Sequence, residues 1–202
     1  MNKCIILCAG GFDGLLEKPT KNDFLIAADG GYRHAQSLGI TPDCILGDFD
    51  SLGYVPEGAN VFPVEKDDTD AMLAVRHGLS LGFQTFYIYG SLEGDRVDHT
   101  VANLQTLLFL AERGATGCLV GSTQIVTTLK NGSLSLPESK RGIVSVFAIG
   151  GEAKGVSIQG LQYEVDNVTL SPSFPLGVSN HCVGKPAEIS VTDGTLLVIY
   201  DR

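Results

Sequence analysis

The chain has 202 residues, 44% of them hydrophobic and 18% charged, which is enough apolar surface for a real core and suits one large domain or two small ones. Its net charge is −9, and its lysines and arginines form no cluster, so the composition argues against a nucleic-acid partner. No apolar run approaches the ~18 residues of a membrane span, and the apolar stretch at the N-terminus is too short for a signal peptide, so we expect no membrane partner.

Short apolar runs and helical patterns alternate over residues 1–120. Apolar residues recur at helical spacing over Asp68–Leu81 and His99–Arg113, which predicts helices there. Alternating strands and helices imply βαβ units and a mostly parallel sheet, in which ligands bind beyond the carboxyl ends of the strands. We predict buried strands at Lys3–Leu7, Phe24–Ala28, Cys44–Leu46, Val61–Val64, Thr85–Tyr89 and Cys118–Val120.

The pattern changes near Gln124, after which no helical pattern is found and short β-type segments are separated by Gly, Pro, Asn and Ser. The sequence therefore predicts an α/β fold, with an N-terminal, Rossmann-like α/β domain at 1–123 followed by a C-terminal antiparallel β-sandwich at 124–202. The predicted strands of the second part are Gln124–Leu129, Ile143–Ala148, Val156–Ile158, Val168–Leu170, Glu188–Val191 and Leu196–Tyr200.

The five cysteines, at positions 4, 8, 44, 118 and 182, include no C-x-x-C pair, and their number is odd. Most of them fall within or beside apolar runs. This usage is typical of reduced thiols in a core, and it predicts a cytoplasmic protein.

Acidic motifs follow successive predicted strands of the first part. Asp is a poor residue for strand and helix interiors, so this excess indicates turns, caps or metal ligands. The motifs are A-D-G-G at 28–31, G-D-F-D-S at 47–51, K-D-D-T-D at 66–70, and a segment from Gly90 to His99 that contains Gly94, Arg96 and Asp98.

A cation site is the reading that we favour for Asp48 and Asp50. They are two residues apart, so in an extended segment both carboxylates point the same way and repel unless a cation lies between them. Oxygen ligands of this kind suit Mg²⁺, which takes one or two carboxylates together with substrate phosphates. Asp70 would complete the site from the neighbouring strand end.

The other motifs contain residues that would contact an anion. Gly30 and Gly31 would let a phosphate or sugar approach the backbone closely. Arg96 offers a two-pronged donor for phosphate oxygens. Asp98 and His99 stand at a predicted helix start, where backbone N–H groups point at an anion.

Each motif alone has a plainer explanation. A lone D-x-D is often a surface turn, Asp67, Asp68 or Asp98 would serve as a helix N-cap, Gly30–Gly31 is an ordinary turn, and His99 would be structural. The coincidence of Asp at four consecutive strand ends favours a metal–nucleotide site.

At these residues the sequence resembles the thiamine pyrophosphokinase family. The A-D-G-G, G-D-F-D-S and K-D-D-T-D strings and the Gly90–His99 segment match that family's pattern in order and spacing. Gly160–Tyr163 and Gly177–Asn180 resemble its thiamine-side motifs. The Gly90 to Arg96 interval is one residue longer than the family form, which affects Glu93, Gly94 and Asp95, and Tyr163 stands where some members have Trp.

The resemblance implies a homodimer with active sites between subunits, which moves the pyrophosphoryl group of ATP onto the thiamine hydroxyl and releases AMP. It implies an ATP- and Mg²⁺-binding catalytic domain at 1–123 and a thiamine-binding domain at 124–202. Tyr163 would stack on thiamine, while Ser179 and Asn180 would hydrogen-bond its pyrimidine. Mg²⁺ would be held by Asp48, Asp50 and Asp70; ATP would contact Asp29, Gly30, Gly31, Ser51, Thr69, Gly90, Arg96 and His99; and the catalytic residues would be Asp48, Asp50, Asp68, Arg96 and Asp98.

The sequence is compatible with alternatives for the general base, for the acceptor and for catalysis itself. Either Asp98 or Asp68 would accept the proton of the attacking hydroxyl. The acceptor could be another heterocyclic alcohol, because the motifs of the second half are short. A non-catalytic nucleotide sensor would use the same acidic motifs without turnover.

Overall fold

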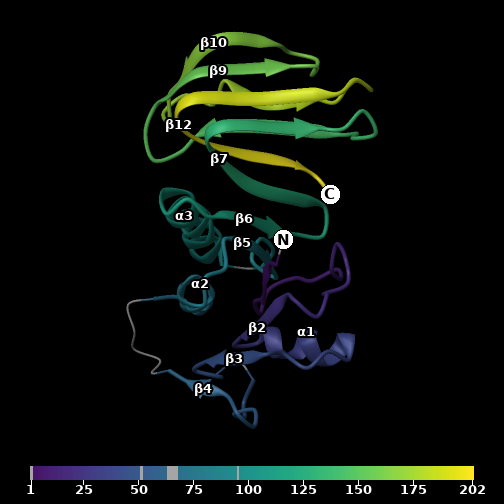
Figure 1. The fold of residues 1–202 in the computed structure, drawn as a ribbon, viewed down its shortest axis with the longest axis vertical. Coiled ribbons are helices and arrows are strands. Elements are labelled where there is room, and N and C mark those ends of the chain that lie inside the picture. Colours follow the sequence, from purple (N-terminus) through teal and green to yellow (C-terminus); the bar gives the residue numbers. More distant parts are fainter. Residues whose placement is uncertain (1, 51, 63–67, 95) are drawn as a thin grey trace. The chain divides into compact units, whose positions relative to one another are not determined.

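The structure is a computed structural model that describes residues 2–50, 52–62, 68–94 and 96–202. The chain forms two compact units (Figure 1). Unit 1 comprises Met1–Leu110 and Gly114–Ser122, and unit 2 comprises Ala111–Arg113 and Thr123–Arg202. Whether binding functions divide at residue 123, as the sequence suggests, stays a prediction.

Unit 1 contains a parallel sheet with strand order β6-β5-β1-β2-β3-β4, which confirms the predicted α/β class. The predicted strand at Val61–Val64 is short in the described part of the chain, and residues 63–67 lie outside it. The strands are β1 (Cys4–Leu7), β2 (Phe24–Ala28), β3 (Cys44–Gly47), β4 (Asn60–Val61), β5 (Thr85–Tyr89) and β6 (Thr116–Val120).

The strand order of unit 1 reverses direction at β1. From β1 the chain proceeds through β2, β3 and β4 on one side, and it then returns to place β5 and β6 on the other side. Every residue of β1 is buried, so this strand is the centre of the unit. In open parallel sheets the crevice at such a reversal, outside the carboxyl ends of the strands, is where ligands bind.

The helices of unit 1 are α1 (Gly31–Leu38), α2 (Asp70–Ser80) and α3 (Val97–Glu112). The last two confirm the predicted helices, with starts that differ by two residues and ends that differ by one. The sequence did not predict α1, because it buries only Gly31 and Ala35 and so has no apolar stripe to signal it. Its end is marked by Gly39, which adopts the left-handed backbone conformation common after a helix.

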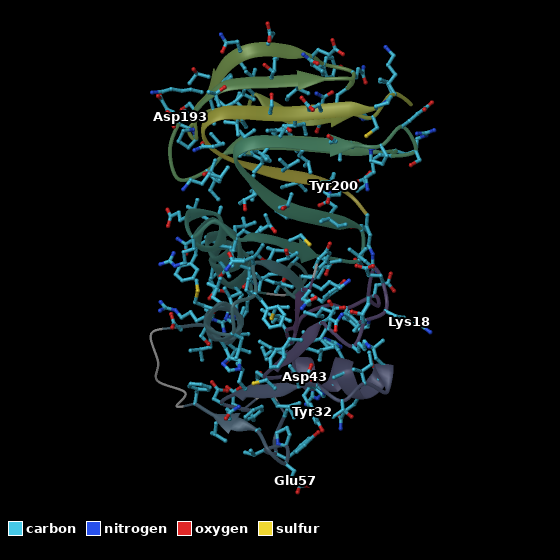
Figure 2. All side chains as sticks on the ribbon, viewed as in Figure 1. Lys18, Tyr32, Asp43, Glu57, Asp193 and Tyr200 are labelled. Carbon is cyan, nitrogen blue, oxygen red and sulfur yellow. The ribbon has the colours of Figure 1, made fainter. Side chains whose placement is uncertain are left out.

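Unit 2 is antiparallel throughout its described strand pairs, as predicted. Its long strand β12 pairs with β9 over its first half and with β8 over its second half, and β7 runs beside both halves. The two strands predicted at Glu188–Val191 and Leu196–Tyr200 are parts of one strand, and its register against β7 shifts between Val191 and Thr195. Figure 2 labels Asp193 at this shift and Tyr200 in the second half of the strand. The strands are β7 (Gln124–Leu136), β8 (Ile143–Ala148), β9 (Ala153–Gln159), β10 (Val165–Leu170), β11 (Gly177–His181) and β12 (Ala187–Asp201).

One apolar core joins both halves of β12 in unit 2. Val144 and Val146 of β8 belong to the same buried cluster as Val156 and Ile158 of β9. Side chains from two strand layers therefore interdigitate in a single core, as in a β-sandwich. Among the described residues, the helices are too short or too polar to cross a membrane.

Candidate functional site

A cleft of about 520 Å³ lies in unit 1 at the carboxyl ends of its strands. Its lining comes from the segments that follow β1, β2, β3 and β5 and from the first turns of α2 and α3. It therefore occupies the crevice on both sides of β1, where the strand order reverses. The predicted site residues that line it are Asp29, Asp48, Asp50, Thr69, Asp70, Gly90, Arg96 and His99.

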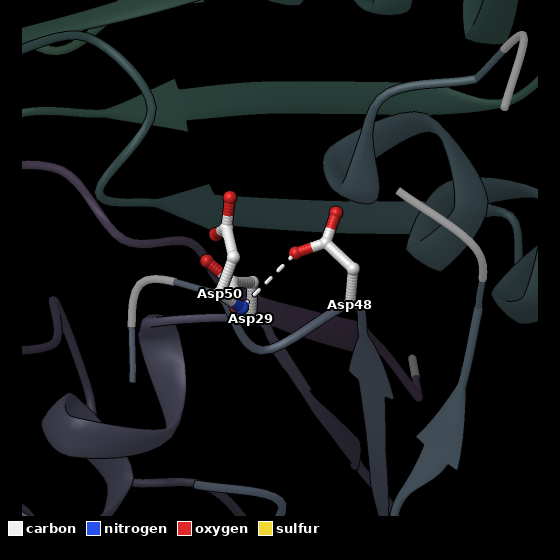
Figure 3. A group of neighbouring side chains, drawn as sticks. All are labelled: Asp29, Asp48 and Asp50. Atoms are coloured by element: carbon white, nitrogen blue, oxygen red, sulfur yellow. Dashed lines mark hydrogen bonds between the residues drawn. The ribbon is translucent and has the colours of Figure 1, made fainter. Parts of the chain in front are cut away.

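Three carboxylates converge in this cleft. Asp29 follows β2, and Asp48 and Asp50 follow β3; one oxygen atom from each lies within 4.8 Å of the other two (Figure 3). Asp29 is buried, Asp48 is partly exposed and Asp50 is exposed. Gly47 allows this approach, because a Cβ there would lie only 3.0 Å from the Cα of Asp29.

The D-x-D segment is a turn, so the prediction that it is extended is wrong. Phe49 has φ = +62°, in the left-handed region that a bulky residue rarely adopts, and its side chain is 3% exposed. The N–H of Asp50 donates to Oδ1 of Asp48 at 3.2 Å, the dashed line in Figure 3. Burial of Phe49 thus fixes a turn that presents both neighbouring carboxyl groups to the cleft.

Carboxylates so close together repel one another. Two unit charges about 4 Å apart cost about 1 kcal/mol in water and about 4 kcal/mol at the effective dielectric near a protein surface. An oxygen-only set with a partly open side fits Mg²⁺, which keeps several waters and shares substrate phosphates. The residues present therefore suit this cation.

Asp70 lines the same cleft from the first turn of α2, but in the described part of the chain it is Asp29 that completes the close group with Asp48 and Asp50. The side chain of Thr69 accepts a hydrogen bond from the N–H of Met72 at 3.2 Å and so caps this helix. The alternative reading in which Asp68 is the cap is therefore wrong, and Asp67 lies outside the described residues.

Arg96 and Asp98 form an ion pair beside the cleft. Nη2 of Arg96 lies 2.7 Å from Oδ2 of Asp98, and both side chains are largely exposed. The hydrogen bond from Arg96 holds the pKa of Asp98 below its ordinary value, and the same bond raises the pKa of Arg96. A carboxylate with a lowered pKa is a weaker base.

Asp68, the other candidate base, pairs with Nε of Arg76 at 3.1 Å. Within the described residues, neither Asp68 nor Asp98 belongs to the lining of the cleft. His99 lines it from the first turn of α3 and is exposed. Each candidate base is therefore paired with an arginine and lies outside the described cleft lining.

The glycines of the predicted site have packing roles. A Cβ on Gly90, where φ is +64°, would lie 2.3 Å from the carbonyl oxygen of Cys8. A Cβ on Gly31 would lie 1.8 Å from the carbonyl oxygen of Leu7. Gly30 is the N-cap of α1. Within the described residues, neither Gly30 nor Gly31 lines the cleft. Ser51 lies outside the described residues.

Glu93 lines the cleft, and no role is predicted for it from the sequence. One oxygen of its carboxyl group accepts the N–H and the hydroxyl of Ser122, at 2.6 and 2.7 Å. Its backbone carbonyl accepts the N–H of Gly11 at 3.2 Å. The segment between β5 and α3, which carries Arg96, is thereby tied to the ends of β6 and β1. The signal for this residue was the extra length of the Gly90–Arg96 interval.

We expect Glu93→Ala to loosen this segment. Hydrogen bonds to charged groups contribute about 1.5–3 kcal/mol each, so the melting temperature should fall. If the cleft binds ATP, as the sequence resemblance implies, the KM for ATP should rise by about 10-fold, the size of effect seen when a group that orients a metal ligand is removed. Glu152→Ala, which removes an exposed carboxylate in unit 2, serves as the control. An unchanged KM in a folded Glu93→Ala protein would contradict this role.

Three of the cysteine thiols are expected to be inert. Burial raises the pKa of Cys4, Cys8 and Cys118 to about 12, so each is almost wholly protonated at neutral pH, and the thiolate is the reactive form. We expect iodoacetamide at pH 8 to leave these three unmodified in the native protein and to alkylate them after denaturation, as read by peptide mass spectrometry. Rapid native labelling of Cys8, which lines the cleft, would show that the cleft opens.

The thiamine-side candidates lie in unit 2. Tyr163 is 61% exposed, and Ser179 is exposed with φ = +60°. Asn180 is 5% exposed, and its side chain is hydrogen-bonded to the backbone of Tyr163. The structure thus brings Tyr163 and Asn180 together.

A second cavity in unit 1, of about 570 Å³, is lined by the end of α1 and the start of β3. Tyr32, Asp43 and Glu57, labelled in Figure 2, belong to its lining. Of the predicted site residues that the structure describes, none lies there. The smaller cleft is therefore the candidate site.

Fold and cleft together define a protein of the parallel α/β class with an acidic ligand site, joined to an antiparallel β unit. The thiamin pyrophosphokinase catalytic domain matches residues 16–118, and the thiamin pyrophosphokinase vitamin B1 binding domain matches residues 133–196. The chain belongs to the thiamin pyrophosphokinase family.

Solved structures share the fold over the full length. Thiamine pyrophosphokinase from Bacillus subtilis has a TM-score of 0.85 at 22% identity, with 99% of each chain covered. Thiamin pyrophosphokinase from Geobacillus thermodenitrificans has 0.81 at 22%, covering 98% of this chain and 97% of that one. Thiamin pyrophosphokinase from Candida albicans has 0.79 at 17%, covering 100% and 89%. A sequence comparison with curated proteins gives no match.

Proposed function

We propose that this protein transfers the pyrophosphoryl group of ATP to the hydroxyl of thiamine, giving thiamine diphosphate and AMP. The observation that carries the proposal is the convergence of Asp29, Asp48 and Asp50 in a cleft that Arg96 also lines. Membership of the thiamin pyrophosphokinase family supports the choice of reaction and of acceptor.

In the proposed reaction the thiamine hydroxyl oxygen forms a bond to the β-phosphorus of ATP. The bond from that phosphorus to the oxygen bridging to the α-phosphorus breaks, and AMP leaves with the electron pair. The hydroxyl proton passes to a carboxylate, either Asp68 or Asp98. Transfers of this kind depend on positioning and on charge neutralisation.

The residues of the cleft would supply that neutralisation. Asp48, Asp50 and Asp29 would hold Mg²⁺, and Asp70, predicted from the sequence as the third ligand, lines the same cleft. Bound there, the ion would neutralise charge on the phosphate oxygens. Arg96 would turn from Asp98 toward the phosphates, since both side chains of that pair are exposed and free to reorient. Thr69, Gly90 and His99 would contact the nucleotide.

Tyr163 would stack on the flat, cationic acceptor. Ser179 would contact the same ligand, and a homodimer with its active sites between subunits stays a prediction that molar mass in solution would test. A cytoplasmic location also stays a prediction.

One assay tests the proposed reaction. The protein is incubated with ATP, Mg²⁺ and thiamine, and the nucleotide products are separated. AMP formed together with thiamine diphosphate is the expected result. ADP would mean transfer of one phosphate, and AMP formed only with another alcohol would change the acceptor. Nucleotide binding without turnover would favour a sensor, and each of these results would overturn the proposal.

A further inference from the structure

The side chain of Asn180 is engaged with the backbone of Tyr163. Its Oδ1 accepts the N–H of Tyr163 at 2.9 Å, and its Nδ2 donates to the carbonyl oxygen of Tyr163 at 2.6 Å. Oδ1 also accepts the N–H of His181 at 2.9 Å. The side-chain amide of Asn180 therefore hydrogen-bonds both the N–H and the carbonyl of Tyr163, as the backbone of a neighbouring strand would.

The adjacent residues continue this pairing by ordinary backbone contacts. Leu161 and Cys182 form an antiparallel bridge, and the N–H of Gln162 donates to the carbonyl of His181 at 3.0 Å. Residues 161–163 thus lie along residues 180–182, and the side chain of Asn180 supplies the last step.

The irregular backbone of β11 explains why a side chain takes this place. Ser179 has φ = +60°, its N–H donates to Oγ of Ser145 at 3.0 Å, and the register of β11 against β8 shifts between Gly177 and Asn180. A left-handed residue turns the chain at this point, so ladder pairing is interrupted beside Asn180.

The hydrogen-bonding capacity of Asn180 is nearly used up. An asparagine oxygen accepts at most two hydrogen bonds, and both are made here; its nitrogen donates two, and one is made. The opposite placement of O and N would set donor against donor at the Tyr163 N–H. Asn180 thus has no acceptor left for a ligand, and because only 5% of the residue is exposed, its remaining N–H has little access to one.

The ring of Tyr163 is by contrast 61% exposed, although its backbone is fixed. An aromatic ring on a fixed backbone presents contact area with little conformational entropy to lose on binding. We propose that Asn180 is a positioning residue of the acceptor site, which fixes Tyr163 for stacking on a flat cationic ligand and does not itself touch that ligand. This inference rests on the proposed function, with thiamine as the acceptor.

A double-mutant cycle tests the inference. Asn180→Ala should raise the KM for thiamine by about 10-fold and leave kcat at saturating thiamine within about twofold. In a Tyr163→Ala background the same change should have almost no further effect, because Asn180 acts through that ring. A direct contact with thiamine would make the two effects multiply, and that result would overturn the inference.

Further variants separate positioning from loss of folding. Asn180→Asp keeps the size of the side chain but replaces the donor to the Tyr163 carbonyl with a carboxylate oxygen, so it should behave like Asn180→Ala. Asn131→Ala is the matched control, because the Asn131 side chain also accepts a backbone N–H, that of Gly194 at 2.9 Å. The control should leave the thiamine KM unchanged even where it lowers the melting temperature. An equal rise of KM in the control would overturn the inference.

Thiamine binding, measured by calorimetry without ATP, separates failure of this inference from failure of the proposed reaction. A wild-type protein that makes no AMP but binds thiamine would overturn the reaction, and the same cycle on Kd would still test Asn180. A wild-type protein that does not bind thiamine would overturn both.

Discussion

Asp50→Asn is expected to lower turnover by about 100- to 1,000-fold at every Mg²⁺ concentration, the size of effect produced by removing one electrostatic group at a reacting centre. The Asp50 carboxyl group shares the cleft with those of Asp29 and Asp48 within 4.8 Å, so its loss removes one charge from the proposed cation site. Asp50 is exposed, and the turn before it is held by the buried Phe49, so the fold should survive.

The same variant should be more stable than the wild type without Mg²⁺ and should be stabilised less by Mg²⁺. Without the cation, removing one of three crowded charges relieves repulsion of about 1 kcal/mol, which would raise the melting temperature by about 2–4 °C. With Mg²⁺ the wild-type protein should gain stability by mass action, and the variant should gain much less. Scanning calorimetry with and without Mg²⁺ measures both effects.

Asp193→Asn is the matched control for this experiment, since it removes an exposed carboxylate of unit 2. It should change neither turnover nor the response to Mg²⁺. A folded Asp50→Asn protein with near-normal turnover would contradict the metal assignment, and a stabilisation by Mg²⁺ equal to that of the wild type would do so independently.

The sequence predicts strands well where their residues are mostly apolar and largely buried. Phe24–Ala28 and Thr85–Tyr89 were predicted with the bounds that the structure shows, because a continuous apolar run of this length between turn residues has few other uses. The helix α1 and the strand β11 escaped prediction for the opposite reason. Most of their residues are polar or exposed, and they are stabilised by packing and pairing with segments distant in sequence.

The group of three converging carboxylates shows the same limit of prediction from sequence. Asp48 and Asp50 are only two residues apart in sequence, so their proximity could be predicted. That Asp29 joins them depends on the pairing of β2 beside β3 and on the close approach of Gly47 to Asp29, which no local pattern reveals. The engagement of Asn180 with Tyr163 likewise requires two segments seventeen residues apart to meet.

Gly31→Ala is expected to destabilise unit 1 by at least about 3 kcal/mol, at or beyond the usual range for overpacking a core. The new Cβ would lie 1.8 Å from the carbonyl oxygen and 2.4 Å from the carbonyl carbon of Leu7. Leu7 ends β1, which is buried and paired on both sides, so its backbone cannot move away cheaply. Chemical denaturation would measure the loss.

Two other arguments predict different outcomes for this variant. Helix propensity favours Ala over Gly by about 1 kcal/mol, so α1 considered alone would be stabilised. The sequence-based reading of Gly31 as a place for a phosphate predicts unchanged stability and weaker ATP binding. The steric argument outweighs both, because a contact of 1.8 Å must be relieved by moving a central strand. Gly151→Ala is the control, since a Cβ there meets no atom within 4 Å. A Gly31→Ala protein as stable as this control would show that α1 can shift from β1, and the packing role assigned to Gly31 would then be wrong.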